Sequence, residues 1–452
     1  MIKKANQILH LPFSSTITSR LVRAIAVGLI TGLIVSVFRW IIDHTMQILY
    51  FIYPQMKANP MWLVLYIVLM FAITLVLGKI IAPYLDQLVG SGVPQIEAIF
   101  LNENKMPWWS VLWRKFVGGL LAICLGLMLG REGPCIEMGA MVGQGLAETT
   151  FKSDAEELQE MQECGVAAGL AAAFSAPIAG ALFLVEEISF DFKPKKVIAV
   201  LAATFSADFV TILFFGNQPC LYLPVNGYLP VNIYWTLPII GVGLGLLAYV
   251  YQYALLSLKP WFNKIKKIPA IYHSIIPFVL IIPVGLWNAH LLGGSHVLID
   301  DLFKNNLGIH AATSWSFVLI PVLLFVIRFV FSMLSYGSSV PGGIFMPILV
   351  LGAILGIFCA NLMIKTNIIT PTYYPHILVI SMAAYFGAIE KAPFTAVMLI
   401  TEMVGTVQQV LPMVITVFIA YYVLDLLGGQ PVYEALRLQM DYHKLSDNKT
   451  KN

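Results

Sequence analysis

Long apolar stretches, interrupted by glycine and proline rather than by charge, dominate the pattern of this chain. Segments such as Trp62 to Leu77 and Phe317 to Ile327 are almost continuously hydrophobic. A transmembrane β-strand would alternate apolar and polar residues over about ten positions. The pattern therefore predicts membrane-crossing helices and excludes a transmembrane barrel.

Several apolar segments are too short to cross a membrane. Val93 to Leu101, Pro177 to Val185 and Pro393 to Ile400 are each bounded by glycine or proline after about ten residues. Half-length helices at membrane depth are tolerated where their ends line an enclosed cavity, and in transporters they mark the binding site. We expect these segments to build such a site.

Composition agrees with a membrane protein, because 59% of the 452 residues are hydrophobic and only 11% are charged. Soluble domains carry about 25% charged residues. At roughly 20 residues per crossing, this apolar content allows at most about a dozen crossings. The expected fold class is an all-α polytopic membrane protein, with residues 1–452 forming a single membrane domain.

Charge and cysteine usage exclude several other classes. The net charge of +3 is scattered along the chain, which argues against nucleic-acid binding. The five cysteines form no CxxC pair and the eight histidines show no ligand spacing, so a disulfide framework and a metal site are not expected. An intramembrane enzyme is disfavoured because HExxH, paired membrane aspartates and a GxSxG serine with a histidine are absent.

Lysine and arginine clusters predict the orientation in the membrane. The four densest clusters are Lys3, Lys4, Arg20 and Arg23, then residues 193–196, then residues 259–267, and finally the tail after Arg437. We expect all four in the cytoplasm, with both termini inside. Residues 209–258 carry no charge, and the Pro-rich turn from Gly216 to Pro230 within them is expected to be an external loop between two crossings. The N-terminal apolar run lacks a cleavage site and continues through Arg39 and Asp43, so it is expected to stay as the first membrane helix.

Three segments of the first half match three of the second half in the same order. The pairs are Ser91–Asn102 with Gly294–Asn305, Gly130–Gly143 with Gly343–Gly356, and Ala176–Glu186 with Ala392–Glu402. Three collinear matches indicate an internal duplication, with halves at about 24–214 and 233–426 and a short cytoplasmic tail at 438–452. We favour inverted copies, because inversion brings equivalent half-helices to the membrane midplane from opposite sides.

Three glycine-proline motifs carry the candidate chemistry: GSGVP (Gly90–Pro94), GREGP (Gly130–Pro134) and GGIFMP (Gly342–Pro347). Glycine allows a tight turn and proline suits the first helical turn, so each motif predicts a helix N-terminus with free N–H donors. Such ends carry about half a positive charge. Several converging helix N-termini would bind an anion without a fixed cation. A lysine or arginine at the site would hold the anion too tightly to release it.

These motifs, together with Tyr433 in GQPVYEAL, resemble the signature set of the CLC family of chloride channels and chloride/proton exchangers, in its bacterial type. The likeness extends from about Arg20 to Arg437. It implies a fold of tilted and half-length helices in two inverted repeats, and a homodimer with one anion pathway per subunit. The chloride-binding residues that it implies are Ser91, Gly92, Arg131, Ile344, Phe345 and Tyr433.

The resemblance also implies two proton-carrying glutamates. Glu132 of GREGP would be the external gate: at a helix N-terminus its carboxylate can occupy the place of a transported anion and leave it when protonated. The alternative interpretation of Glu132 is that it only complements the helix dipole and has no part in transport. Glu187 matches the internal proton-transfer glutamate of exchangers, whereas its neighbour Glu186 is expected to form a salt bridge at the cytoplasmic surface, and Glu402 to be structural.

The presence of other charged residues in apolar stretches requires an explanation, because inserting each one into the membrane costs about 2.5 to 3.5 kcal/mol. Arg328 and the Glu390–Lys391 pair are expected to be structural partners of buried acids. Glu137 stands where bacterial members often have glutamine, and we expect it either to influence the titration of the gate or to lie at the outer surface of the subunit.

The favoured function is antiport of chloride against protons across the plasma or inner membrane, with no cofactor besides bound chloride. A passive voltage- or pH-gated chloride channel is one alternative, and Glu187 argues against it. A fluoride/proton antiporter is another, and Ser91 argues against it. The 19 residues after Tyr433 hold no regulatory domain, so no nucleotide is expected as a partner.

Overall fold

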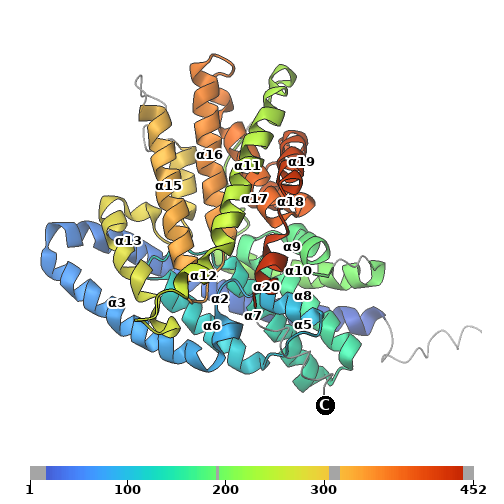
Figure 1. Ribbon diagram of the computed structural model, residues 1–452. Coiled ribbons are helices and arrows are strands. Elements are labelled where there is room, and N and C mark those ends of the chain that lie inside the picture. The colour runs from blue at the N-terminus through green and yellow to red at the C-terminus, as the bar shows by residue number, and fades with distance from the viewer. Residues whose placement is uncertain (1–16, 190–192, 226, 305–315, 441–452) are drawn as a thin grey trace, which may run out of the picture.

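Helices make up most of the computed structural model, which describes residues 17–189, 193–225, 227–304 and 316–440 (Figure 1). The longer helices are α2 (Ile17–Ala58), α3 (Pro60–Ile81), α6 (Trp108–Ile123), α7 (Glu132–Leu146), α8 (Ala155–Phe174), α10 (Pro194–Phe215), α11 (Thr236–Leu256), α13 (Ile275–Trp287), α15 (Ser316–Gly337), α16 (Phe345–Lys365), α17 (Tyr374–Glu390), α18 (Pro393–Val404) and α19 (Val410–Leu426). The shorter ones are α4 (Leu85–Leu88), α5 (Val93–Phe100), α9 (Pro177–Phe183), α12 (Leu258–Phe262), α14 (His296–Phe303) and α20 (Val432–Leu438). The predicted all-α fold class is confirmed.

Seven segments of the described chain are long and apolar enough to cross a membrane. They are Ile17–Ala58, Pro60–Leu88, Pro194–Phe215, Thr236–Phe262, Ala270–Trp287, Leu319–Gly337 and Phe345–Lys365. The first of them is α2, which continues through Arg39 and Asp43 as the sequence predicts. In Figure 1, α15, α16 and α11 rise together at the top, whereas α2 and α3 run across the lower part.

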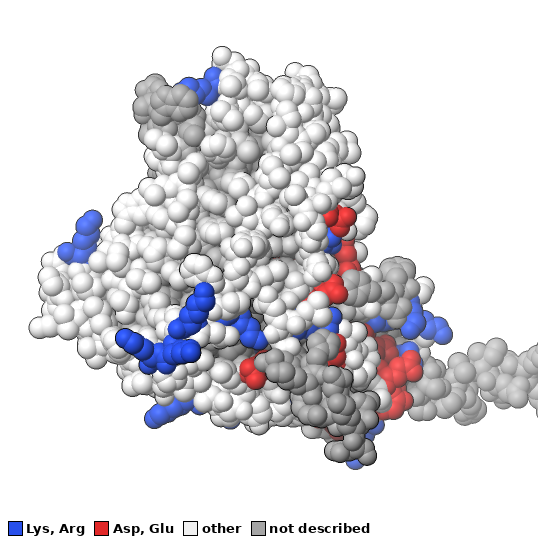
Figure 2. Space-filling model, viewed as in Figure 1, with Lys and Arg blue, Asp and Glu red and all other residues white. Residues whose placement is uncertain are grey.

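The surface has the distribution of charge that a lipid environment requires. Figure 2 shows an upper body with few charged residues, while most lysine, arginine and acidic side chains on this face lie along the lower part. Large apolar side chains are freely exposed on the outer helices, among them Phe51 (69% exposed) and Leu319 (63%). In water this exposure would be costly, whereas hydrocarbon chains solvate it.

Glycine brings α7 and α8 into backbone contact. A Cβ on Gly139 would lie 2.0 Å from the Gly165 carbonyl oxygen, and one on Gly165 would lie 2.0 Å from the Gly139 oxygen. Small residues allow this approach, and dispersion contacts then hold membrane helices together without help from water. The close pair fixes the direction of α7, whose N-terminus carries the GREGP motif.

The predicted short helices are confirmed, since α5 spans eight residues, α9 seven and α18 twelve. Their ends are held in a reciprocal way that the sequence did not indicate. Glu402, at the end of α18, accepts hydrogen bonds from the N–H groups of Ile178 (3.1 Å) and Ala179 (2.7 Å) at the start of α9.

Glu186 makes the matching contact at the start of α18. Its carboxylate accepts from the backbone N–H groups of Phe394 (3.1 Å) and Thr395 (2.7 Å), and from the Thr395 hydroxyl (2.7 Å). The predicted surface salt bridge of Glu186 is therefore wrong. A carboxylate at a helix N-terminus satisfies free donors and complements the helix dipole, which removes the need for a basic partner.

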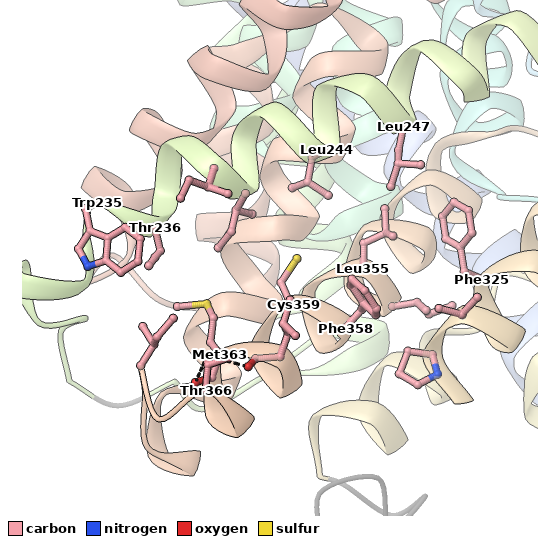
Figure 3. Close-up of a pocket in the computed structure, with 18 residues that line it drawn as sticks. Trp235, Thr236, Leu244, Leu247, Phe325, Leu355, Phe358, Cys359, Met363 and Thr366 are labelled. Carbon is pink, nitrogen blue, oxygen red and sulfur yellow. Dashed lines mark hydrogen bonds between the residues drawn. The ribbon is translucent and has the colours of Figure 1, made fainter. Parts of the chain in front are cut away.

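An apolar groove of about 550 Å³ lies between α11, α15 and α16 (Figure 3). Leu244, Phe325 and Leu355 are among its lining residues, and no charged side chain of the described chain lines it. An anion needs hydrogen-bond donors, and this lining is almost entirely apolar, so the groove is not the anion site.

Candidate functional site

Backbone hydrogen bonds join the three glycine-proline motifs. Gly90 donates to the Val340 oxygen (2.9 Å) and accepts from the Gly342 N–H (3.0 Å). Gly130 and Gly343 exchange two hydrogen bonds of 2.7 Å each. Turns that lie more than 200 residues apart in the sequence therefore meet at one place inside the protein.

Each motif begins a helix at this meeting point. Gly92 has a φ of 90°, a left-handed value that favours glycine, and α5 starts directly after it. A Cβ on Gly133 would lie 2.7 Å from the Ser91 Cβ, so the start of α7 packs against the GSGVP turn. Ser91 is buried, and its hydroxyl oxygen accepts from the Val93 N–H at 3.3 Å.

Ile344 and Phe345 form the start of α16, and both are buried. The Phe345 ring packs among three other rings, with centroid distances of 5.5 Å to Phe174, 5.7 Å to Phe183 and 4.6 Å to Phe386. These aromatic contacts fix the backbone of residues 344 and 345, and with it the free N–H groups of the helix end.

Two tyrosines approach the site from the second half of the chain. Tyr433, on α20, is completely buried, and its hydroxyl lies beside the Glu390 carboxylate. The Tyr336 hydroxyl, near the end of α15, lies beside Ser91. Sequence reasoning missed Tyr336, although it stands only six residues before the GGIFMP motif; one tyrosine among 19 has no distinguishing local signal.

Glu132 reaches back over the turn that precedes it. A Cβ on Gly130 would lie 2.3 Å from Glu132 Oε2 and 3.0 Å from the Met346 nitrogen. The carboxylate is fully buried and faces backbone N–H groups at the starts of α7 and α16. Donors of this kind stabilise either a carboxylate or a small anion, and only one of the two can occupy the place.

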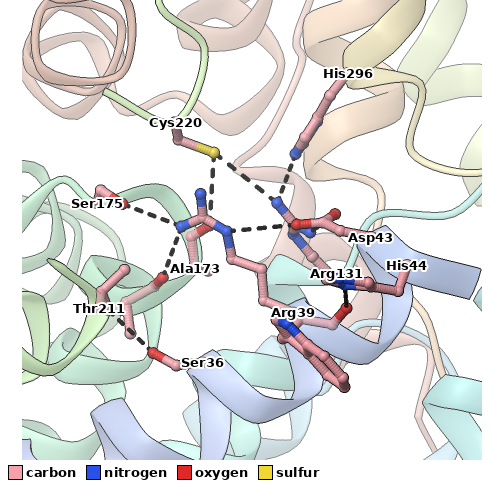
Figure 4. A network of polar contacts seen from close by, with 12 residues as sticks. Ser36, Arg39, Asp43, His44, Arg131, Ala173, Ser175, Thr211, Cys220 and His296 are labelled. Atoms are coloured by element: carbon pink, nitrogen blue, oxygen red, sulfur yellow. Dashed lines mark hydrogen bonds and ion pairs between the residues drawn. The ribbon is translucent and has the colours of Figure 1, made fainter. Parts of the chain in front are cut away.

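Arg131 belongs to a polar network with Asp43 and His296 (Figure 4). Its guanidinium donates to Asp43 Oδ1 (2.5 Å) and lies 2.9 Å from His296 Nε2, while it makes no contact with Ser91 or Tyr433. The network lines a cavity of about 290 Å³ that also reaches Glu132. Arg131 is thus placed at one entrance to the site, apart from the other predicted anion ligands.

Glu187 lies in a π-helical segment, Leu184–Ser189, that follows α9. Its side chain is buried and lines a cavity of about 400 Å³ together with Glu97, Glu434 and Arg437. Arg437 pairs with Glu103 at 2.7 Å and with Glu97 at 3.4 Å.

A different cavity, of about 540 Å³, reaches the GSGVP turn. Gly90, Tyr336 and Lys259 are among its lining residues, and it shares none with the cavity at Glu187. Helix α20 separates the two, because Leu436 faces this cavity whereas Glu434 and Arg437 face the other. Two separate approaches therefore lead into the protein on the side of Lys259 and Arg437.

Glu137 does not lie at the outer surface of the subunit, and its expected influence on the gate stays a prediction. It is completely buried and forms an ion pair of 2.5 Å with Lys115, which is also completely buried. The Lys115 ammonium further donates to the Leu88 and Gly90 oxygens at 2.9 and 3.0 Å. The pair thus ties α6 and α7 to the turn that carries Ser91, a contact that no local pattern reveals.

Glu137→Gln should destabilise the protein strongly, by about 3 to 5 kcal/mol, because it leaves a buried ammonium without its counter-charge. Thermal unfolding in detergent measures the effect. Glu157→Gln is the control, since its partner Arg23 and Glu157 itself are partly exposed and such pairs contribute about 0 to 1 kcal/mol. Equal unfolding temperatures for the two variants would contradict the structural role of the buried pair.

Arg328 and Lys391 also differ from expectation. Arg328 donates to the Leu291 and Gly293 oxygens and to the Ser295 hydroxyl, with no acid among these partners. Lys391 pairs with Asp425, which is largely exposed. Their assignment as partners of buried acids is wrong, because carbonyl oxygens and a surface carboxylate satisfy the two cations.

Known proteins resemble this chain over most of its length. The family model described as voltage gated chloride channel matches residues 73–425. The H(+)/Cl(-) exchange transporter ClcA of Vibrio parahaemolyticus is 33% identical over 387 residues, covering 83% of this chain and 80% of that protein. ClcA of Yersinia pseudotuberculosis is 30% identical over 432 residues, covering 92% and 86%.

Solved structures share the fold. A slow cyanobacterial Cl−/H+ antiporter matches with a TM-score of 0.83 and 27% identity, covering 93% of this chain and 97% of that one. A eukaryotic CLC transporter matches with a TM-score of 0.74 at 21% identity, covering 92% and 74%. With the family match over most of the chain and the joined glycine-proline motifs, this protein belongs to the CLC family.

Proposed function

We propose that this protein is a secondary active antiporter that exchanges chloride for protons. The observation that carries the proposal is the pair of separate cavities, one at Gly90 and Tyr336 and the other at Glu187. A passive chloride pore needs only the first, whereas an exchanger needs a proton entrance as well. The relatives named as H(+)/Cl(-) exchange transporters support the same activity.

In this mechanism chloride enters through the cavity at Lys259 and binds near the Ser91 and Tyr433 hydroxyls. The N–H groups of Gly92, Ile344 and Phe345 supply the remaining donors, and their partial charges attract chloride without holding it permanently. Protons enter by the Glu187 cavity. Because Glu132 faces the same kind of donors, its carboxylate competes with chloride until a proton neutralises it and it moves towards the Arg131 network.

The proposed setting is the cell membrane, which the chain spans several times with both termini in the cytoplasm. We propose a homodimer, which the exposed apolar side chains of α9, α18 and α19 support; these include Ile178, Phe394, Leu411, Phe418 and Tyr422. Chloride and protons are the transported partners. Bound chloride is the only cofactor in this mechanism, and the protein acts as a transporter and not as an enzyme.

Reconstitution in liposomes tests the function directly. Purified protein is placed in vesicles under a chloride gradient, a potassium ionophore clamps the voltage, and chloride and proton fluxes are recorded together. Antiport predicts that outward chloride movement drives protons inward against their gradient, in a fixed ratio. Chloride flux without any proton movement would identify a passive channel.

Ser91→Pro should shift the preference from chloride towards nitrate several-fold, because it removes the hydroxyl and one backbone N–H from the anion site. Electrical measurement of reversal potentials under mixed-anion gradients gives the ratio. Ser91→Ala is the control that removes the hydroxyl alone. If neither variant changes the nitrate-to-chloride ratio, Ser91 is an ordinary helix cap and not a ligand.

A further inference from the structure

Glu390 is a completely buried carboxylate that the mechanism above does not use. It is the last residue of α17, its polar neighbour is the Tyr433 hydroxyl, and no described lysine or arginine forms an ion pair with it. The adjacent Lys391 does not neutralise it, because that ammonium pairs with Asp425 and lies over the Tyr421 ring at 5.2 Å. A buried carboxylate without a cationic partner is costly, so a functional reason is expected.

A side-chain clamp places Glu390 beside the anion site. The Gln252 amide donates to the Ile389 oxygen at 2.8 Å and to the Gln430 oxygen at 2.7 Å, which joins the end of α17 to the start of α20. The Tyr433 hydroxyl consequently lies next to the Glu390 carboxylate. In the proposed mechanism, chloride binds near the Tyr433 hydroxyl.

Glu390 also faces the proton-entry side. Glu390 is one of the carboxylates close enough to Glu187 to interact with it, together with Glu97 and Glu434. The titratable groups that surround Glu390 on the neighbouring elements are Glu97 of α5, Glu187 of the π-helical segment, Tyr251 of α11, Tyr336 of α15 and Tyr433 of α20. This set contains no cation, so nothing on these elements locks Glu390 in its ionised form.

We propose that Glu390 is a proton-carrying residue between Glu187 and the anion site. The inference rests on the proposed antiport and names a further residue for it. An O–H bond breaks at Glu187 and one forms at the Glu390 carboxylate, which leaves Glu187 ionised and Glu390 neutral. When Glu390 gives the proton up towards Glu132, its own O–H bond breaks, and no electron is transferred in either step.

The arrangement explains how a proton can leave Glu187 without entering the chloride path on the cytoplasmic side. Glu187 lines its own cavity, whereas Glu390 does not line that cavity and lies beside Tyr433. Each carboxylate lowers the tendency of the other to be ionised, since like charges in a low-dielectric interior repel. A proton arriving at one therefore favours the release of a proton from the other.

Paired flux measurements in liposomes test the role of Glu390. Glu390→Gln should lower proton flux about tenfold or more while chloride flux stays within about twofold of wild type, since a neutral amide keeps the shape but carries no exchangeable proton. Glu390→Asp should retain proton flux, because it restores a carboxyl group. Glu163→Gln is the control: Glu163 is equally buried but is paired with Lys196 at 2.7 Å beside the cytoplasmic lysine cluster.

The outcomes separate this inference from the proposed function. Wild-type coupling in Glu390→Gln would overturn the role of Glu390 and leave antiport intact. An equal loss of both fluxes in the glutamine variant would indicate a structural role and overturn it as well. Should that variant fail to reconstitute, Glu390→Met supplies the same comparison. Absence of proton flux in the wild type would refute the antiport itself and, with it, the role of Glu390.

Discussion

Replacing Glu132 by glutamine should abolish coupled proton transport and leave a chloride flux that no longer depends on pH. The amide removes the negative charge that competes with chloride at the N–H groups of α7 and α16, and it also removes the group that carries the proton. We expect proton flux to fall at least a hundredfold. Simultaneous chloride and proton recording between about pH 4.5 and 7.5 measures both changes.

Glu132→Asp is the matched control for this prediction. It keeps a titratable carboxyl group at the same helix end, so chloride flux should still respond to pH even though the shorter side chain reaches less far. A Glu132→Gln variant that still pumps protons uphill on a chloride gradient would show that Glu132 is not the gate. Unchanged pH dependence of chloride flux would lead to the same conclusion.

Glu187→Gln should abolish proton movement while chloride continues to cross. Glu187 lines a cavity that the chloride approach does not share, so a neutral side chain there interrupts only the proton route. Glu132 should still respond to external pH in this variant, because it reaches the other cavity, lined by Arg131 and His296. The expected result is a chloride flux near wild type with proton flux at the background of empty liposomes.

Glu186→Gln provides the adjacent control. Its carboxylate binds the start of α18, so this change should lower stability and leave the ratio of chloride to protons unchanged. A Glu187→Gln variant with wild-type coupling would remove Glu187 from the mechanism. Loss of coupling in Glu186→Gln but not in Glu187→Gln would exchange the roles of the two neighbours.

Local patterns determined most of the secondary structure. The apolar runs predicted α2 and the other membrane-crossing helices, and the Gly and Pro interruptions predicted the short helices α5, α9 and α18. The sequence also predicted the helix starts at the three glycine-proline motifs, because capping and the constraints of glycine and proline act within a few residues. The roles assigned to Ser91, Tyr433 and the two glutamates stay predictions until the fluxes are measured.

Tertiary structure decided the partners of the buried charges. The sequence shows Glu137 as an acidic residue in an apolar stretch. Its partner Lys115 lies on another helix, and no nearby residue in the sequence indicates the pair. Glu186 looked like a surface acid beside lysines, yet a free helix end more than 200 residues away satisfies it better. Electrostatic pairing depends on distance in space, and the chain sequence records only distance along the backbone.

The sequence by itself determined that this is a helical membrane protein with short helices whose N-termini are suited to an anion. Only the tertiary structure decided that the GSGVP, GREGP and GGIFMP turns are joined, that Tyr336 lies beside Ser91, and that the Tyr433 hydroxyl lies beside Glu390. The physical reason is the sequence separation over which the interactions act. Helix formation and capping are set by neighbours along the chain. An anion site and a proton route arise where distant segments pack together and exclude the lipid.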